Sequence, residues 1–302
     1  MANDKRTVAN NAIFTKSDDQ SGQALSTPTP NVIDGMQAKS IYDILKEDFG
    51  LTLPVATISL PSQGLIYPTN SSWHNCKLVE IKPITTREED ILTNRNYHKK
   101  GIVINELIKS CLVKKMNPNE LISGDKTAIL YAIRAASYGS EYQAEVTCSD
   151  RECKKTSEQT FDIAKFEYSY LKIQPVAENT NIFEFILPQT KLKVHFKFLT
   201  GLDEDDINMT TESNRKMNPD YNADIQQQIF HHLVSVNGVE NRQKLHLLSQ
   251  NLSAVDSSAL RKYISDNEPR IITRQSVTCP YCGNIEEVDM PIGASFLWPN
   301  AR

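Results

Sequence analysis

Two short stretches, VTCSDREC at residues 146–153 and VTCPYCG at residues 277–283, hold four of the six cysteines of this chain. A run of alternating polar and apolar residues leads into each of them, YQAEVTC in the first and IITRQSVTC in the second. Alternation over such a length is typical of β-strands. The sequence therefore predicts two strands, far apart along the chain, that each end in a cysteine-bearing turn.

The cysteines of these two turns form a ligand set that suits zinc. They are Cys148, Cys153, Cys279 and Cys282. Tetrahedral structural zinc is commonly held by four thiolates, and Gly283 can adopt the positive φ that lets backbone amides point at sulfur. A single shared ion would also close a loop of roughly 125 residues. We expect a zinc-ribbon-like site with a structural Zn2+, because four cysteines leave no coordination position open for catalysis.

Other states of these cysteines stay open at this level. The gap between Cys148 and Cys153 is at the long end for a zinc turn, and no glycine follows it. Two reduced hairpins without a metal ion would fit the same residues, as would a disulfide within CPYCG. Only the spatial arrangement of the four sulfur atoms can separate these alternatives.

Composition excludes several classes of protein. The chain has 302 residues, of which 39% are hydrophobic and 23% charged, and this is ordinary for a globular protein. A net charge of −4 and a pI near 5.9 provide no basic field for nucleic acid or anionic lipid. No apolar run approaches the roughly 20 residues that span a bilayer, and MANDKRTVAN lacks the hydrophobic region of a signal peptide. We expect no membrane or nucleic-acid partner, and a reducing cytoplasm in which paired cysteines bind metal.

The pattern of polar and apolar residues predicts an α+β fold with mixed helices, short strands and four segments. Residues 1–35 are polar and aperiodic, which is typical of a disordered arm. Residues 36–50 should form an amphipathic docking helix. Residues 51–155 and 270–302 should form a core domain that carries the zinc turns, and residues 156–269 an inserted subdomain of a hairpin plus helices.

The predicted docking helix has the sequence AKSIYDILKEDFG, with Ser40 as its cap and Gly50 as its stop. Its apolar residues fall on one side of the helix. They are Ile41, Ile44, Leu45 and Phe49. A short amphipathic helix on a flexible tether can bind a partner protein, and packing on its own domain is the alternative.

Local signals place further elements between the cysteine turns. Thr86 and Glu89 match a capping box, and Asp125 is the expected cap of a helix over SGDKTAILYAIRAASYG. INELIKSCLVKK carries apolar residues at helical spacing, including Cys111, which we expect in the core. IFEFILPQTKLKVHFKFLTG alternates along two arms and predicts a hairpin. DIQQQIFHHLVSV has helical spacing that extends to Leu233.

Residues capable of catalysis form no recognisable arrangement. The acidic run that begins at Asp203 lacks the alternating ligands and the glycine of a calcium loop, and we expect it on a solvated helix start or loop. His231 and His232 are adjacent, diverge by roughly 100° on a helix, and should take surface or half-buried positions. Phosphate-loop, GxSxG and dinucleotide-binding motifs are not found. We therefore expect no enzyme activity and no small-molecule substrate.

The order of several motifs resembles the T-even-type bacteriophage baseplate proteins. The resemblance covers roughly residues 55–299 and rests on six stretches: LPSQGLIYP at 60–68, TTREEDIL at 85–92, KGIVINELIKSCL at 100–112, SGDKTAILYAIRAASYGSEY at 123–142, the cysteine turn that starts with VTC at 146–148, and CPYCGNIEEVDMPIGASFLWP at 279–299. It implies a structural or assembly component of the tail baseplate, or of its hub, in a contractile-tailed phage. It also implies a place in the virion, other baseplate and tail proteins as partners, and no catalytic residues.

Two alternative functions follow from the cysteines alone. Zinc ribbons often serve nucleic-acid-binding accessory proteins, but the basic residues here are dispersed, as in LKVHFKF and RKYISDNEPR. A metal-dependent hydrolase would need a metal with an open coordination position, and the sequence shows none.

Overall fold

The computed structural model describes residues 46–52, 54–217, 224–292 and 296–297. The chain divides into two compact units, residues 1–51 and residues 52–302. In the first unit, residues 46–49 form a helical turn that Gly50 ends at a φ of 66°. The predicted cap, Ser40, lies outside the described residues.

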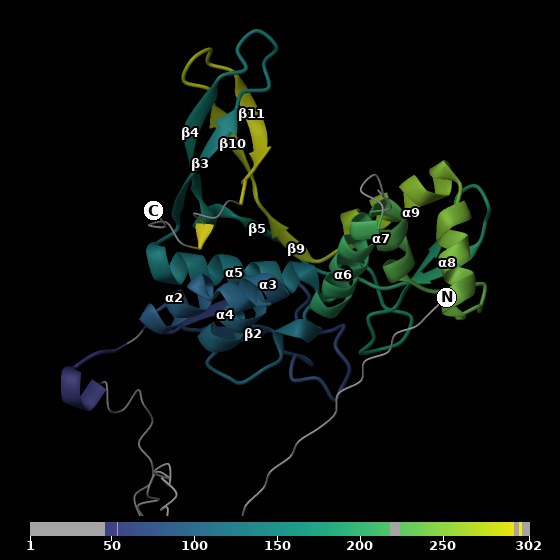
Figure 1. Ribbon diagram of the computed structural model, residues 1–302, viewed down its shortest axis with the longest axis horizontal. Coiled ribbons are helices and arrows are strands. Elements are labelled where there is room, and N and C mark those ends of the chain that lie inside the picture. Colours follow the sequence, from purple (N-terminus) through teal and green to yellow (C-terminus); the bar gives the residue numbers. More distant parts are fainter. Residues whose placement is uncertain (1–45, 53, 218–223, 293–295, 298–302) are drawn as a thin grey trace, which may run out of the picture. The chain divides into compact units, whose positions relative to one another are not determined.

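The second unit is a mixture of helices and short antiparallel strands, and this confirms the predicted α+β class (Figure 1). Its α-helices are α2 (Thr86–Thr93), α3 (Arg95–Lys100), α4 (Val103–Cys111), α5 (Ser123–Tyr138), α6 (Gly201–Met217), α7 (Asp224–His232), α8 (Arg242–Asn251) and α9 (Ala254–Asn267). Two 3-10 turns, η1 (Pro118–Glu120) and η2 (Ile163–Lys165), complete the helical elements in the described part of this unit.

The strands among the described residues form five small sheets. Four of these sheets have two strands each: β1 (Ala56–Ser59) with β2 (Leu78–Ile81), β3 (Glu141–Thr147) with β4 (Thr156–Asp162), β5 (Glu167–Ser169) with β9 (Arg270–Ile272), and β10 (Arg274–Thr278) with β11 (Ile285–Asp289). The fifth has the order β6 (Phe183–Ile186), β7 (Lys193–Phe196), β8 (Leu233–Val236). The pairing of β6 with β7, Phe183 opposite Phe196, confirms the predicted hairpin.

Helix α5 separates two hydrophobic clusters. Ile129 and Ile133 point into the larger cluster, which also includes α4, the β6–β7–β8 sheet and α9. Ala128 and Tyr131 point into the smaller cluster, which lies under the β3–β4 and β10–β11 hairpins. Since residues three or four apart share a helix face, one helix can support both cores.

Helix α4 buries the face that its sequence predicts. Leu107, Ile108 and Cys111 have no exposed surface, and burial raises the pKa of the Cys111 thiol to about 12. Cys111 is therefore a packing residue, as expected for a thiol inside an apolar core.

Three local predictions were wrong. The capping box of α2 is formed by Thr85 and Glu88, one residue before the predicted pair, because Thr85 holds the extended backbone that an N-cap requires. Asp125 does not cap α5, since the N-cap position is Ile122. Helix α7 ends at His232, and Leu233 begins strand β8 because its segment completes a sheet with β7.

Candidate functional site

The four cysteines of the two turns come together at the ends of two hairpins. Strand β3 delivers Cys148 and β10 delivers Cys279, and each strand pairs with the strand that follows it, β4 and β11 (Figure 1). We call these four strands and their turns the ribbon lobe, and the four cysteines the cysteine cluster. Glutamine side chains join the two hairpins: Gln159 donates to the carbonyl of Thr278 at 3.2 Å, and Gln275 to that of Asp162 at 2.7 Å.

The sulfur positions fit a tetrahedral metal site. Cys148 Sγ lies 3.7 Å from Cys282 Sγ, and Cys153 Sγ lies 3.8 Å from Cys279 Sγ. All four sulfur atoms lie within 4.8 Å of one another. Four sulfurs around zinc, at about 2.3 Å from it, have edges of about 3.8 Å, whereas a disulfide needs about 2.05 Å. All four cysteines are free thiols, so neither turn holds a disulfide, and the sulfur spacing fits a shared ion.

Both turns hold their cysteines with backbone hydrogen bonds. Cys148 N donates to Lys155 O at 3.1 Å, and Cys279 N donates to Asn284 O at 2.9 Å. Gly283 has a φ of 73°, the left-handed backbone that the sequence predicts for it. These bonds fix the spacing of the two cysteines in each turn before any ion binds.

Charge is unevenly shared among the thiols. The backbone amides of Tyr281 and Cys282 lower the pKa of Cys279 to about 7. The backbone amide of Asn284 acts to lower the pKa of Cys282, but desolvation and the three neighbouring thiols outweigh it and raise that pKa to about 12. Thiols packed this closely cannot all ionise without a cation. A divalent metal would remove this repulsion and hold all four as thiolates.

The ribbon lobe does not have the charge of a nucleic-acid-binding ribbon. Its acidic side chains outnumber its basic ones. The acidic residues are Glu141, Glu145, Asp150, Glu152, Glu158, Asp162, Glu286, Glu287 and Asp289, and the basic residues are Arg151, Lys154, Lys155 and Arg274. Because phosphate contacts dominate nucleic-acid affinity, this charge balance does not favour that role.

The predicted partner-binding residues fall mostly outside the described residues. Ile41, Ile44 and Leu45 lie there. Phe49 is described, and 76% of its surface is exposed. An exposed phenylalanine at the end of a helical turn fits either a docking contact or a contact with another part of the chain.

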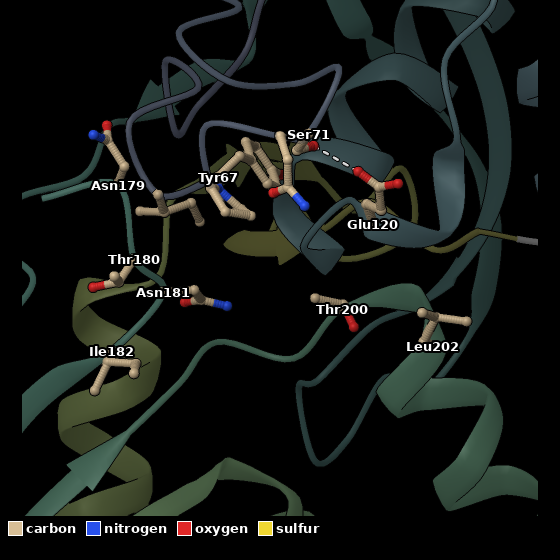
Figure 2. A pocket seen from close by; sticks show the side chains of 12 residues that line it. Tyr67, Ser71, Glu120, Asn179, Thr180, Asn181, Ile182, Thr200 and Leu202 are labelled. Atoms are coloured by element: carbon tan, nitrogen blue, oxygen red, sulfur yellow. Dashed lines mark hydrogen bonds between the residues drawn. The ribbon is translucent and has the colours of Figure 1, made fainter.

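A cavity lies beside the LPSQGLIYP turn, and no motif in the sequence predicts it (Figure 2). Its volume is about 480 Å3, and Ile66, Pro68, Ile182 and Leu202 line it together with polar side chains. The carboxylate among them, Glu120, accepts hydrogen bonds from Ser71 at 2.5 Å and Asn117 at 3.3 Å. Because its walls come from distant parts of the chain, no spacing in the sequence could indicate it.

The LPSQGLIYP turn is anchored by a buried carboxylate at the start of α5. Asp125 accepts hydrogen bonds from Ser62 N at 2.9 Å, from Ser62 Oγ, and from Tyr67 OH at 2.6 Å. The tyrosine hydroxyl in turn accepts from Ile122 N at 3.1 Å. Two of the motifs that carry the family resemblance therefore meet in one network, and this network serves the fold.

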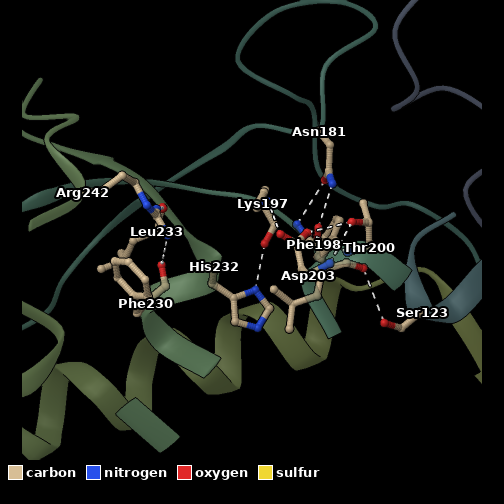
Figure 3. A network of polar contacts seen from close by, with 11 residues as sticks. Ser123, Asn181, Lys197, Phe198, Thr200, Asp203, Phe230, His232, Leu233 and Arg242 are labelled. Carbon is tan, nitrogen blue, oxygen red and sulfur yellow. Dashed lines mark hydrogen bonds and ion pairs between the residues drawn. The ribbon is translucent and has the colours of Figure 1, made fainter. Parts of the chain in front are cut away.

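A second polar network surrounds the start of α6 (Figure 3). Lys197 Nζ lies 2.6 Å from Asp203 Oδ1, and Thr200 donates to Oδ2 from its amide at 3.0 Å and its hydroxyl at 2.8 Å. His232 Nδ1 donates to Lys197 O at 2.8 Å. Although the acidic run does start a helix, the prediction that Asp203 is solvated was wrong. Its side chain is 15% exposed because it caps α6 and pairs with a lysine.

The two histidines differ from each other. His231 is 7% exposed, so the predicted surface or half-buried position was wrong for it, whereas His232 is half-buried as expected. Burial lowers the pKa of both imidazoles. Neither of them is part of a metal-ligand group in the described part of the chain.

Comparison with known proteins finds the family that the motifs quoted above resemble. The family model described as "T4 bacteriophage base plate protein" matches residues 65–298, which is most of the chain. No curated protein and no solved structure matches it. None of the helices among the described residues combines the length and apolar character needed to cross a bilayer. The chain therefore belongs to the T4 bacteriophage base plate protein family, whose members are structural components of the phage tail baseplate.

Proposed function

We propose that this protein is a structural or assembly component of the baseplate hub in a contractile-tailed phage, and that it acts through protein–protein contacts and not through catalysis. The family match over residues 65–298 carries this proposal. Family membership implies a place in the tail of the virion and contact with other tail proteins. Assembly in the host cytoplasm and a position in the hub are the finer parts of the proposal.

A structural zinc ion in the cysteine cluster is the second part of the proposal. The two sulfur pairs at 3.7 and 3.8 Å and the mutual proximity of all four sulfurs support it. Structural zinc contributes folding free energy directly. Here Cys148, Cys153, Cys279 and Cys282 would lock two hairpins that are otherwise joined by a few side-chain hydrogen bonds.

The third part concerns partner binding by residues 36–50. Ile41, Ile44, Leu45 and Phe49 would insert their apolar side chains into a groove of another baseplate protein, as amphipathic helices do. The exposure of Phe49, at 76%, supports a contact outside its own helical turn. A few apolar anchors then carry most of the binding free energy.

Phage particles that carry a double variant test this function. We expect Ile41→Asp with Leu45→Asp to abolish incorporation into baseplates and to leave the melting temperature of the purified protein unchanged. The reason is that burying two carboxylates in the partner's groove costs several kcal/mol. Mass spectrometry of purified particles and of tail assembly intermediates measures incorporation, and calorimetry measures stability.

The matched control changes the opposite side of the same predicted helix, Asp43→Ala with Lys46→Ala, and should incorporate normally. Wild-type incorporation of the Ile41 and Leu45 variant would overturn the docking role. A lowered melting temperature would instead show that the helix packs on its own domain.

A further inference from the structure

Asn284, the residue directly after the CPYCG turn, directs three polar groups at the cysteine cluster. Its carbonyl oxygen accepts from Cys279 N at 2.9 Å, and its backbone amide hydrogen-bonds the sulfur of Cys282. Its side-chain Nδ2 donates to Cys148 Sγ at 3.9 Å, across to the other hairpin. One half-buried residue therefore contacts sulfur atoms from both turns.

The side-chain contact differs in kind from the other contacts to these sulfurs. Backbone amides act on Cys148, Cys279 and Cys282 through the local geometry of their own turns. Among the described residues, the side-chain amide of Asn284 is the side-chain N–H group that hydrogen-bonds a sulfur of the cysteine cluster. This hydrogen bond joins two residues that lie 136 positions apart in the chain. It can therefore fix the position of one hairpin relative to the other, which a local amide cannot do.

In a four-thiolate metal site, a hydrogen-bond donor to sulfur would offset part of the excess negative charge. Four thiolates around one divalent cation leave an excess of two negative charges. A hydrogen bond to a thiolate withdraws part of this charge, and groups that hold the ligands in this way contribute to metal affinity. Lys155, in the first turn, faces an aromatic ring: its Nζ lies 4.9 Å from the centre of the Tyr281 ring.

We propose that Asn284 is a positioning residue for the metal: its side-chain amide holds the Cys148 thiolate against the second hairpin and strengthens zinc binding. This inference rests on the proposed zinc site. Asparagine suits the position because its backbone groups close the turn while its short side chain reaches across. Aspartate has the same shape but would present a carboxylate to the thiolates in place of a donor.

Zinc affinity of the full chain, measured by competition with a chromophoric chelator under reducing conditions, tests the inference. We expect one zinc per wild-type chain. We expect Asn284→Ala to keep this stoichiometry but to bind zinc about 10- to 100-fold more weakly, and Asn284→Asp to bind more weakly still. With Co2+ in place of zinc, the sulfur-to-metal charge-transfer band of Asn284→Ala should move to lower energy, because one thiolate loses a donor.

The matched control is Asn96→Ala, which makes the same chemical change at an exposed position in α3 and should leave the affinity unchanged. Equal affinities for Asn284→Ala and Asn96→Ala would overturn the role of Asn284 and leave the zinc site intact. A wild-type chain without zinc would overturn the site itself. An equal loss of melting temperature in the metal-free and zinc-loaded forms of Asn284→Ala would show a purely structural role and would also overturn the inference.

Discussion

Two segments of the fold pass very close to each other at a glycine. Gly124, in the first turn of α5, lies against the chain that leaves α9: a Cβ at this position would lie 1.8 Å from Pro269 O and 2.9 Å from the carbonyl carbon. No rotamer change can relieve such a clash, because the opposing atoms belong to the backbone. The glycine in the SGDK motif is therefore needed to leave room for the backbone of Pro269.

We predict that Gly124→Ala destabilises the protein by about 3 kcal/mol or more, since overpacking a rigid contact costs in that range. Urea unfolding at fixed temperature and pH measures the change. Gly201→Ala is the matched control. Gly201 is also buried at the start of a helix, but its Cβ would meet Lys126 Nζ and Asn119 at 3.4 to 3.6 Å, an ordinary contact. Equal effects of the two substitutions would contradict the argument.

Asp125 shows how far residue-level prediction from sequence reaches. An aspartate near a helix start is a typical cap, and the sequence supported that assignment. The structure instead pairs Asp125 with Ser62, which is 63 positions away in the chain. Burial raises the pKa of the Asp125 carboxyl, and the hydrogen bonds from Ser62 and Tyr67 oppose this change. Local spacing cannot reveal such long-range partners.

Among the elements, α6 depends most clearly on a single side chain. Thr200 and Asp203 cap the helix reciprocally, since Thr200 N donates to Asp203 Oδ2 at 3.0 Å and Asp203 N donates to Thr200 Oγ1 at 3.4 Å. Burial acts to raise the pKa of Asp203, but Lys197 and the two donors of Thr200 outweigh burial and lower it. The ionised carboxylate is therefore the form that stabilises the fold.

We predict that Asp203→Asn lowers the free energy of unfolding by about 1 to 2 kcal/mol at pH 7, from the loss of the cap and the ion pair. A carboxyl whose pKa is depressed in the folded state stabilises that state above its unfolded pKa, for which 3.8 is the ordinary value. This stabilisation disappears as the pH falls through the lowered pKa. The difference between wild type and variant should therefore shrink toward zero at low pH.

Urea unfolding of both proteins over a series of pH values measures this difference. Asp205→Asn on the same helix is the control, because the side chain of Asp205 makes no hydrogen bond or ion pair among the described residues, and its effect should stay within about 0.5 kcal/mol. A difference between wild type and Asp203→Asn that does not depend on pH would contradict the assignment.

Elements with a strong periodic spacing of apolar residues were predictable from the sequence. Elements whose limits depend on contacts with distant segments were not. The β6–β7 hairpin and α4 follow their apolar spacing. The end of α7 does not, because Arg242 donates to the carbonyls of Leu233 at 2.7 Å and Phe230 at 3.3 Å, and the chain then joins β7 as a strand. The cysteine cluster was predictable for a different reason, since its ligand types are rare and its two turns are short. The cavity was not predictable.

At the scale of the whole molecule, the two hydrophobic clusters differ in how far apolar packing alone can stabilise the elements around them. The larger cluster includes most of the helices and many fully buried side chains. The smaller one ends below the tip of the ribbon lobe, where Ile285 is 69% exposed and Tyr281 58% exposed. Regions with few buried apolar contacts open at low free-energy cost. The tip of the lobe should therefore depend on the proposed zinc ion, while the larger cluster should not.

We predict that removing the proposed zinc ion with a chelator, under reducing conditions, speeds backbone hydrogen exchange in β3, β4, β10 and β11 and leaves α4 protected. The binding free energy of a shared ion would act on the hairpins that supply its ligands, and all four sulfurs of these hairpins lie within 4.8 Å of one another. Exchange followed by mass spectrometry, with and without chelator, measures the effect region by region.

Two cysteine variants make this test specific. Cys279→Ser should reproduce the effect of the chelator without any chelator present, because it removes one of the four ligands. Cys76→Ser should behave as wild type, since Cys76 lies outside the cluster and its sulfur donates to Leu78 O at 3.4 Å, a bond that a serine hydroxyl can replace. Unchanged exchange after chelation would show that the hairpins are stable without a metal. Faster exchange in α4 as well would show that the two clusters unfold together, and that the metal stabilises the whole unit and not the lobe alone.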